Sequence, residues 1–149
     1  MIQRKQTIFL LLALCAVIVC LCLPIGRLEG NGLAGELSWY NLGVYSSGGL
    51  NAHPTLFIDL VVVGTLSFIT IFLYKRRPLQ LKLCAANIIL CLVWYGVYIF
   101  AAVAGFASEG NFHINFAACL PLVAMVFLFL ARRGVKADEE LIKSMDRIR

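Results

Sequence analysis

Residues 83–106 read LCAANIILCLVWYGVYIFAAVAGF, a run of 24 residues without a charged side chain. A helix that crosses the hydrocarbon core of a bilayer needs roughly 20 mostly apolar residues, so this run is long enough to span. The whole chain has the same character, because 61% of its 149 residues are hydrophobic and 14% are charged. Soluble domains carry about 45–50% apolar and about 25% charged residues. The composition therefore excludes an ordinary soluble domain and indicates a polytopic membrane protein.

Three further apolar runs qualify as spans, at about residues 7–23, 55–74 and 112–131. A chain of this length cannot cover four such helices with protein, so lipid must cover them. The first run is interpreted as an uncleaved anchor, because no small-x-small cleavage pattern follows it. Short connections make the later runs antiparallel neighbours. We therefore predict an all-α integral membrane protein, with an up-down-up-down four-helix transmembrane bundle in residues 1–131.

Basic residues mark one side of the predicted bundle. Twelve of the thirteen Lys and Arg residues lie before the first run, between the second and third, or after the fourth, and Arg27 is the exception. The positive-inside rule then places both termini in the cytoplasm. The predicted topology anchors are Arg4, Lys5, Lys75, Arg76, Arg77, Lys82, Arg132 and Arg133. The net charge of +5 thus reports topology and attraction to anionic lipid rather than nucleic-acid binding.

Two segments lie outside the predicted spans. Residues 24–54 form a long extracytoplasmic loop, rich in glycine and aromatic residues, that we interpret as packed on the helix ends. A short β-hairpin on the bundle mouth and an interfacial segment are both compatible with this composition. Residues 132–149 form a cytoplasmic tail, in which Asp138 is expected to cap an amphipathic helix on the membrane surface or on a partner. A solvated, frayed tail is the alternative.

Asp59 is the one residue inside a predicted span that is charged at neutral pH. A charge at the bilayer centre costs roughly 2.5–3.5 kcal/mol, and less near the surface, where Asp59 is expected to lie. One interpretation is a structural carboxylate bonded to loop amides or to Arg27. The other is a proton or cation contact in a polar mouth of the bundle. Asn87 in the third run is expected to face a neighbouring helix and to bond across the bundle.

His53, Glu109 and His113 fall at the same predicted end of the bundle as Asp59, and imidazoles with carboxylates can hold zinc. Their spacing matches no metal motif, so they are weak candidates, and no cofactor is predicted. The six cysteines lie inside predicted helices without a CxxC pair, which favours packing over redox chemistry. No pattern typical of catalytic residues is present.

Three short segments carry a resemblance to a known family. The start MIQRKQTIFLLLA, the segment FLYKRRPLQLKLC and the ending ADEELIKSMDRIR resemble domain of unknown function 4293, a family of small membrane proteins typical of Bacteroidota. The likeness covers nearly the whole chain, although residues 24–54 show no match. It implies four membrane helices and an inner-membrane location, and it implies no activity and no functional residues.

Three hypotheses about function follow from these patterns. The leading one is a non-enzymatic accessory or scaffold subunit of a membrane complex, with a membrane-protein partner or a second copy bound. The second is a small transporter or channel that uses Asp59. The third is a metalloenzyme at the outer face that uses His53, Glu109 and His113.

Overall fold

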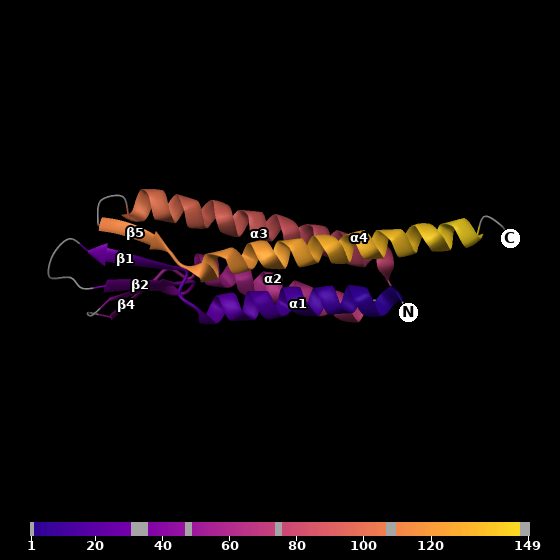
Figure 1. Cartoon of the computed structure of the whole chain (residues 1–149), viewed down its shortest axis with the longest axis horizontal. Coiled ribbons are helices and arrows are strands. Elements are labelled where there is room, and N and C mark those ends of the chain that lie inside the picture. The colour runs from indigo at the N-terminus through magenta and orange to yellow at the C-terminus, as the bar shows by residue number, and fades with distance from the viewer. Residues whose placement is uncertain (1, 31–35, 47–48, 74–75, 107–109, 147–149) are drawn as a thin grey trace.

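The computed structural model describes residues 2–30, 36–46, 49–73, 76–106 and 110–146. Four helices run side by side along the long axis of the molecule, and strands gather at one end, the sheet end (Figure 1). Both termini lie toward the opposite end, the terminal end (Figure 1). The helices are α1 (Ile2–Cys22), α2 (Thr55–Phe72), α3 (Arg77–Phe106) and α4 (Leu120–Asp146), with a 3-10 helix η2 at Phe116–Cys119.

A five-stranded antiparallel sheet contradicts the predicted all-α class. The strands are β1 (Gly26–Gly30), β2 (Glu36–Tyr40), β3 (Gly43–Ser46), β4 (Gly49–Ala52) and β5 (Gly110–Ile114). Their order in the sheet is β4-β3-β2-β1-β5. The predicted hairpin is thus a four-strand meander, and the segment between the third and fourth apolar runs adds the fifth strand. The described part of residues 24–54 thus packs on the helix ends as expected, and it does so as four strands, more than the short hairpin that the composition also allowed.

Alternating side chains explain why the meander folds onto the bundle. Trp39 pairs with Val44 on β3, and both are buried, whereas the adjacent pair of Ser38 and Tyr45 lies on the opposite face of the sheet. Successive residues of a strand point to opposite faces, so one face can be apolar and covered while the other is open. Leu28 on β1 is also fully buried. The covered face therefore closes the sheet end of the bundle.

The predicted fourth span, 112–131, is wrong at its start. Phe112 lies in β5 opposite Leu28, and α4 begins at Leu120. Pro121 therefore stands in the first turn of α4, where its missing N–H costs no intrahelical hydrogen bond. Pro78 occupies the same position in α3, which begins at Arg77. Both prolines therefore lie at the start of an α-helix.

The predicted amphipathic tail is not a separate helix. α4 continues without interruption through Gly134 to Asp146, so this part extends along the axis of the fourth helix. Asp138 does not cap a helix, because it lies inside α4 and is buried. Its Oδ2 atom accepts a hydrogen bond of 2.5 Å from Nε2 of Gln6 on α1. Packing against α1 therefore outweighs the local capping preference.

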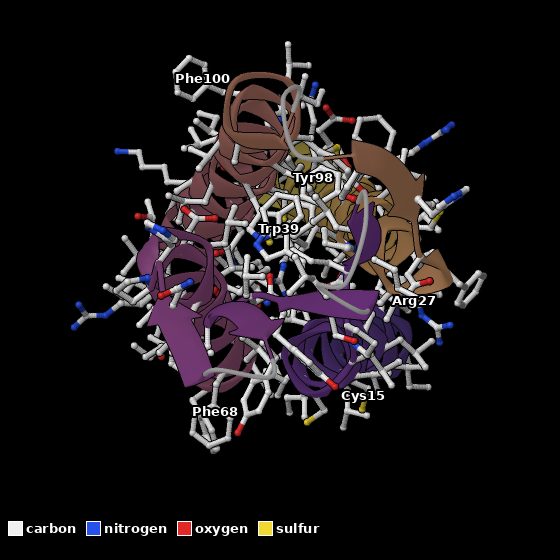
Figure 2. The ribbon with its side chains drawn as sticks, turned by 90° about the vertical axis from the view of Figure 1, so that its left-hand side faces the viewer. Cys15, Arg27, Trp39, Phe68, Tyr98 and Phe100 are labelled. Carbon is white, nitrogen blue, oxygen red and sulfur yellow. The ribbon has the colours of Figure 1, made fainter. Side chains whose placement is uncertain are left out.

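Three segments within the described residues are long and apolar enough to cross a membrane: Thr55–Phe72, Arg77–Val103 and Phe116–Ile142. The apolar part of α1, Gln6–Cys22, is shorter. Each helix turns one stripe inward, as α2 does with Leu56, Leu60, Val63, Ser67 and Thr70. Large apolar side chains cover the outside, and Phe68 and Phe100 point away from the bundle (Figure 2). An apolar exterior of this kind suits lipid as the surrounding solvent.

Candidate functional site

Asn41 joins the sheet to the helices. It lies in the turn between β2 and β3 and is 1% exposed. Its Nδ2 atom donates to the backbone oxygen of Cys20 at the end of α1, over 2.7 Å. Its Oδ1 atom accepts from Nε1 of Trp94 on α3, over 3.2 Å. One amide side chain thus satisfies a helix-end carbonyl and a buried indole N–H, both of which are costly to leave unpaired.

Stacked aromatic rings next to Asn41 also join the sheet to α3. Tyr98 stacks on Trp94 with ring centroids 5.1 Å apart and on Trp39 at 5.0 Å, and Figure 2 shows Trp39 and Tyr98 in the middle of the bundle. Phe112 of β5 meets Trp39 edge-on at 5.7 Å. The hydroxyl of Tyr98 donates to the backbone oxygen of Ile25 over 3.1 Å. We call Asn41, Trp39, Trp94, Tyr98 and Phe112 the junction cluster, and its dense packing indicates a structural role.

Polar side chains also line the contact between α2 and α3, which we call the α2–α3 seam. Nδ2 of Asn87 donates to Oγ of Ser67 over 3.1 Å, which confirms the expected bond across the bundle. Oδ1 of Asn87 and Oδ2 of Asp59 are buried, and neither atom has a hydrogen-bond partner among the described residues. Neither the described loop amides nor Arg27 therefore satisfies this oxygen of Asp59. Asp59 lies on α2 beside the inward-facing residues Leu56 and Leu60, on the same helix as Ser67 of the seam.

The structure describes two of the weak metal candidates, His53 and His113, and it places them on opposite edges of the sheet. His113 lies on the edge strand β5, and His53 follows β4, the edge strand on the other side of the sheet. Glu109 lies outside the described residues. Among the residues that are described, no group of three His, Cys, Asp or Glu side chains is arranged to hold a metal ion. The metalloenzyme hypothesis stays a prediction for the part of the chain that includes Glu109.

The predicted packing role fits half of the cysteines. Cys20, Cys84 and Cys91 are buried among apolar side chains. Cys15 and Cys22 are exposed on α1, and Cys119 is exposed at the end of η2. All six are free thiols.

An apolar surface lies at the start of β3 and on the strands of the β3–β4 hairpin. Tyr45 is 58% exposed, Leu42 and Leu50 are each 41% exposed, and we call these three residues the hairpin patch. Tyr40 meets the ring of Tyr45 edge-on. All four residues of β4 are exposed, and β4 is an edge strand. A strand edge with apolar neighbours and no charge of its own can accept another strand.

The predicted topology anchors gather at the terminal end. Arg76, Lys82, Arg132 and Arg133 are exposed there, and Arg77 is half-buried. Arg4 and Lys5 belong to α1, and Lys75 lies outside the described residues. The sheet occupies the other end of the bundle, where Arg27 is exposed on β1 (Figures 1 and 2). The helices thus separate a basic end from the sheet.

Sequence patterns did not single out Asn41, Trp94 or Tyr98. One signal for Asn41 is present, because a polar residue between two strand-like segments marks a turn. Nothing local shows that this amide enters the bundle, since Cys20 and Trp94 are 21 and 53 residues away along the chain. The contact exists only once α1, α3 and the sheet have assembled.

A helical bundle with membrane-capable helices and a sheet at one end defines the chain as a membrane protein of mixed helix and strand structure. The family model described as "Domain of unknown function (DUF4293)" matches residues 2–148, and the chain belongs to this family. The match confirms the resemblance noted from the three short segments. No match to a curated protein was found.

Proposed function

We propose that the protein is a non-enzymatic accessory or scaffold subunit of a membrane complex. The observation that carries the proposal is the hairpin patch, which leaves Leu42, Tyr45 and Leu50 exposed beside the open edge of β4. The junction cluster holds the sheet rigidly on the helices, so the patch is presented in a fixed position. Its partner is an extended segment of another membrane protein that adds a strand to β4 and places apolar side chains on the patch.

Photocrosslinking in native membranes tests this role. A benzoylphenylalanine in place of Leu50 should give one adduct with a partner protein after irradiation. The matched control replaces Phe129, which is 56% exposed on α4 and predicted to face lipid, and should give no protein adduct. An adduct with the mass of two copies would identify a homo-oligomer instead. Absence of any protein adduct at Leu50, or identical adducts at both positions, would contradict the proposal.

We also propose that the bundle spans a bacterial inner membrane with both termini in the cytoplasm. The support is the position of the exposed basic residues Arg76, Lys82, Arg132 and Arg133 at the terminal end. The sheet then lies in the extracytoplasmic space, where the hairpin patch meets its partner.

A second candidate function, a small transporter or channel, is favoured by Asp59. Its Oδ2 atom is buried on α2 and has no hydrogen-bond partner in the part of the chain that the structure describes. Ionisable groups in membrane helices often mark ion or proton paths. Proteoliposomes with the wild-type protein should conduct protons or cations, and Asp59→Asn should abolish this flux. Equal flux for the two proteins would remove the basis for this function.

A further inference from the structure

A single row of side chains crosses all five strands on the open face of the sheet, which is the face turned away from the junction cluster. Arg27 on β1 lies opposite His113 on β5 and Ser38 on β2. Ser38 lies opposite Tyr45 on β3, and Tyr45 lies opposite Leu50 on β4. Residues directly opposite each other on antiparallel strands share a face, with Cβ atoms about 4.5–5.5 Å apart. We call these five residues the cross-strand row.

The cross-strand row is apolar at one edge of the sheet and basic toward the other. Tyr45 and Leu50 belong to the hairpin patch, whereas Arg27 is exposed three strands away from β4. In Figure 2, Arg27 lies away from the centre of the molecule, where Trp39 and Tyr98 lie. Neighbouring strands are about 4.8 Å apart, so β1 lies about 14 Å from β4. A partner segment on the hairpin patch therefore needs only a short extension over the open face to reach Arg27.

Arg27 carries a charge that has no partner among the described residues. None of them forms an ion pair or a side-chain hydrogen bond with its guanidinium. None of the other twelve Lys and Arg residues belongs to a strand or to a turn between strands. A guanidinium binds a carboxylate through two parallel N–H groups, which fix both the distance and the orientation of the pair. The open face thus offers one defined contact to an acidic side chain.

Coverage by a partner strengthens a contact of this kind. A fully exposed ion pair contributes little, because water and salt screen the two charges. A segment that lies along the cross-strand row excludes water from both charges, and charge pairs between proteins then select the partner and fix its orientation. An acidic residue of the segment is therefore favoured at Arg27, and a basic residue is repelled there.

We propose that the partner of the hairpin patch carries an acidic side chain that binds Arg27, so that one extended segment occupies both the β4 edge and the open face. The inference rests on the proposed scaffold role and names the chemistry of the partner. The segment adds a strand to β4, contacts Tyr45 and Leu50, and then crosses the open face along the cross-strand row. The distance from the added strand to β1 is about 19 Å, which an extended chain covers in roughly six residues. The partner sequence should therefore contain Asp or Glu roughly six positions from an apolar strand.

Photocrosslinking at two positions in native membranes tests the contact. Benzoylphenylalanine in place of Leu50 reports the added strand, and the same amino acid in place of Ser38 reports the open face beside Arg27. Both positions should give an adduct with the same partner protein. Mass spectrometry of the Ser38 adduct should identify a partner peptide that contains Asp or Glu, roughly six positions from the site of attachment at Leu50.

Removal of the charge separates the two contacts. Arg27→Gln should lower the yield of the Ser38 adduct at least fivefold, because the segment then leaves the open face and position 27 becomes accessible. The Leu50 adduct should remain, because the strand added to β4 does not use the guanidinium. Arg27→Lys keeps the charge and should retain more of the Ser38 adduct than Arg27→Gln does. The matched control is Arg76→Gln, which removes an exposed arginine at the terminal end and should change both yields less than twofold.

Each of the other results decides the proposal. An adduct at Leu50 without one at Ser38 would leave the scaffold role standing and overturn the acidic contact. A Ser38 adduct that is insensitive to Arg27→Gln, or whose partner peptide has no acidic residue, would also overturn it. A Ser38 adduct between two copies of this chain would replace the acidic partner by a second copy.

Two further results distinguish this proposal from the scaffold role on which it rests. An Arg27-dependent adduct at Ser38 without one at Leu50 would support the acidic contact and contradict the strand at β4. Absence of an adduct at both positions would overturn both proposals.

Discussion

The junction cluster and the α2–α3 seam both bury polar atoms inside the bundle, yet they treat these atoms differently. In the junction cluster the amide of Asn41 and the N–H of Trp94 have partners at hydrogen-bond distance. In the seam, Asn87 and Asp59 each keep a buried oxygen without a partner. A buried polar network stabilises a fold when it is fully satisfied and costs free energy when it is not. The junction thus secures the sheet, whereas the seam buries two oxygens whose desolvation is not offset by a hydrogen bond within the described residues.

The largest expected effect comes from the centre of the junction. Trp94→Ala removes a fully buried ring that stacks on Tyr98 and donates to Asn41, and we expect the free energy of unfolding to fall by about 4 kcal/mol. Phe100→Ala, on the same helix but 74% exposed, is the control and should change it by less than about 1 kcal/mol. Denaturant titration in detergent measures both. If the two variants lost the same free energy of unfolding, the ring of Trp94 would stabilise the fold no more than an exposed ring does.

The second effect isolates the hydrogen bonds of the junction. Asn41→Ala leaves the carbonyl of Cys20 and the N–H of Trp94 buried without partners, at a cost of about 3 kcal/mol in unfolding free energy. Asn51→Ala, on the exposed strand β4, is the matched control and should lie within about 0.5 kcal/mol of the wild type. Thermal unfolding compares the stability of the two variants with that of the wild type. A neutral Asn41→Ala would show that ring stacking alone holds the sheet.

The third variant changes the seam, and it should increase the free energy of unfolding instead of lowering it. Asp59→Leu removes a buried oxygen that has no partner, so the free energy of unfolding should rise by about 1 kcal/mol. The same unfolding assay measures it. A fall in stability would mean that Asp59 has a structural partner, and the contrast between seam and junction would then be lost.

The smallest effect concerns the hydrogen bond between Asn87 and Ser67 in the seam. Ser67→Ala removes the oxygen that accepts from Asn87, and hydrogen bonds between membrane helices contribute about 0.6 kcal/mol on average. We expect a loss of that size in unfolding free energy, measured against Thr65→Ala, whose hydroxyl bonds within its own helix. A loss as large as that of Asn41→Ala would make the seam as important to the fold as the junction.

The helices were predictable because apolar runs of this length leave few alternatives. Their inward stripes were not, since residues such as Val62 and Val63 look alike in sequence while one is exposed and the other is buried. In a membrane protein, lipid and core accept the same side chains, so hydropathy cannot separate the two faces. The inward orientation of Asn87 could be predicted, because a polar side chain in a membrane helix turns toward the bundle and away from lipid.

The sheet was missed for a different reason. Its strands have four or five residues, and glycines interrupt the alternation that identifies longer strands. The segment of β5 also reads as the start of a span, because Phe112 and Ile114 are apolar. Pairing of Gly26 with Ile114 joins segments on either side of two helices, and no local pattern encodes such a contact.

The candidate site was predictable only in part. Asp59 stood out because it is the one charge inside a predicted span, and the unpartnered oxygen agrees with a special position. The role of Asp138 was misjudged, because its local preference for a helix start was weighed without its partner Gln6 on α1.

Cysteine accessibility tests most directly whether the sheet and the basic end lie on opposite sides of a membrane. Arg27→Cys places a thiol on β1 away from the hairpin patch, and Lys136→Cys places one on the exposed part of α4 at the terminal end. In a background with the native cysteines replaced, a membrane-impermeant maleimide should label Arg27→Cys in intact cells. It should label Lys136→Cys only after the inner membrane is permeabilised. Labelling of both in intact cells, or of Lys136→Cys alone, would contradict the account.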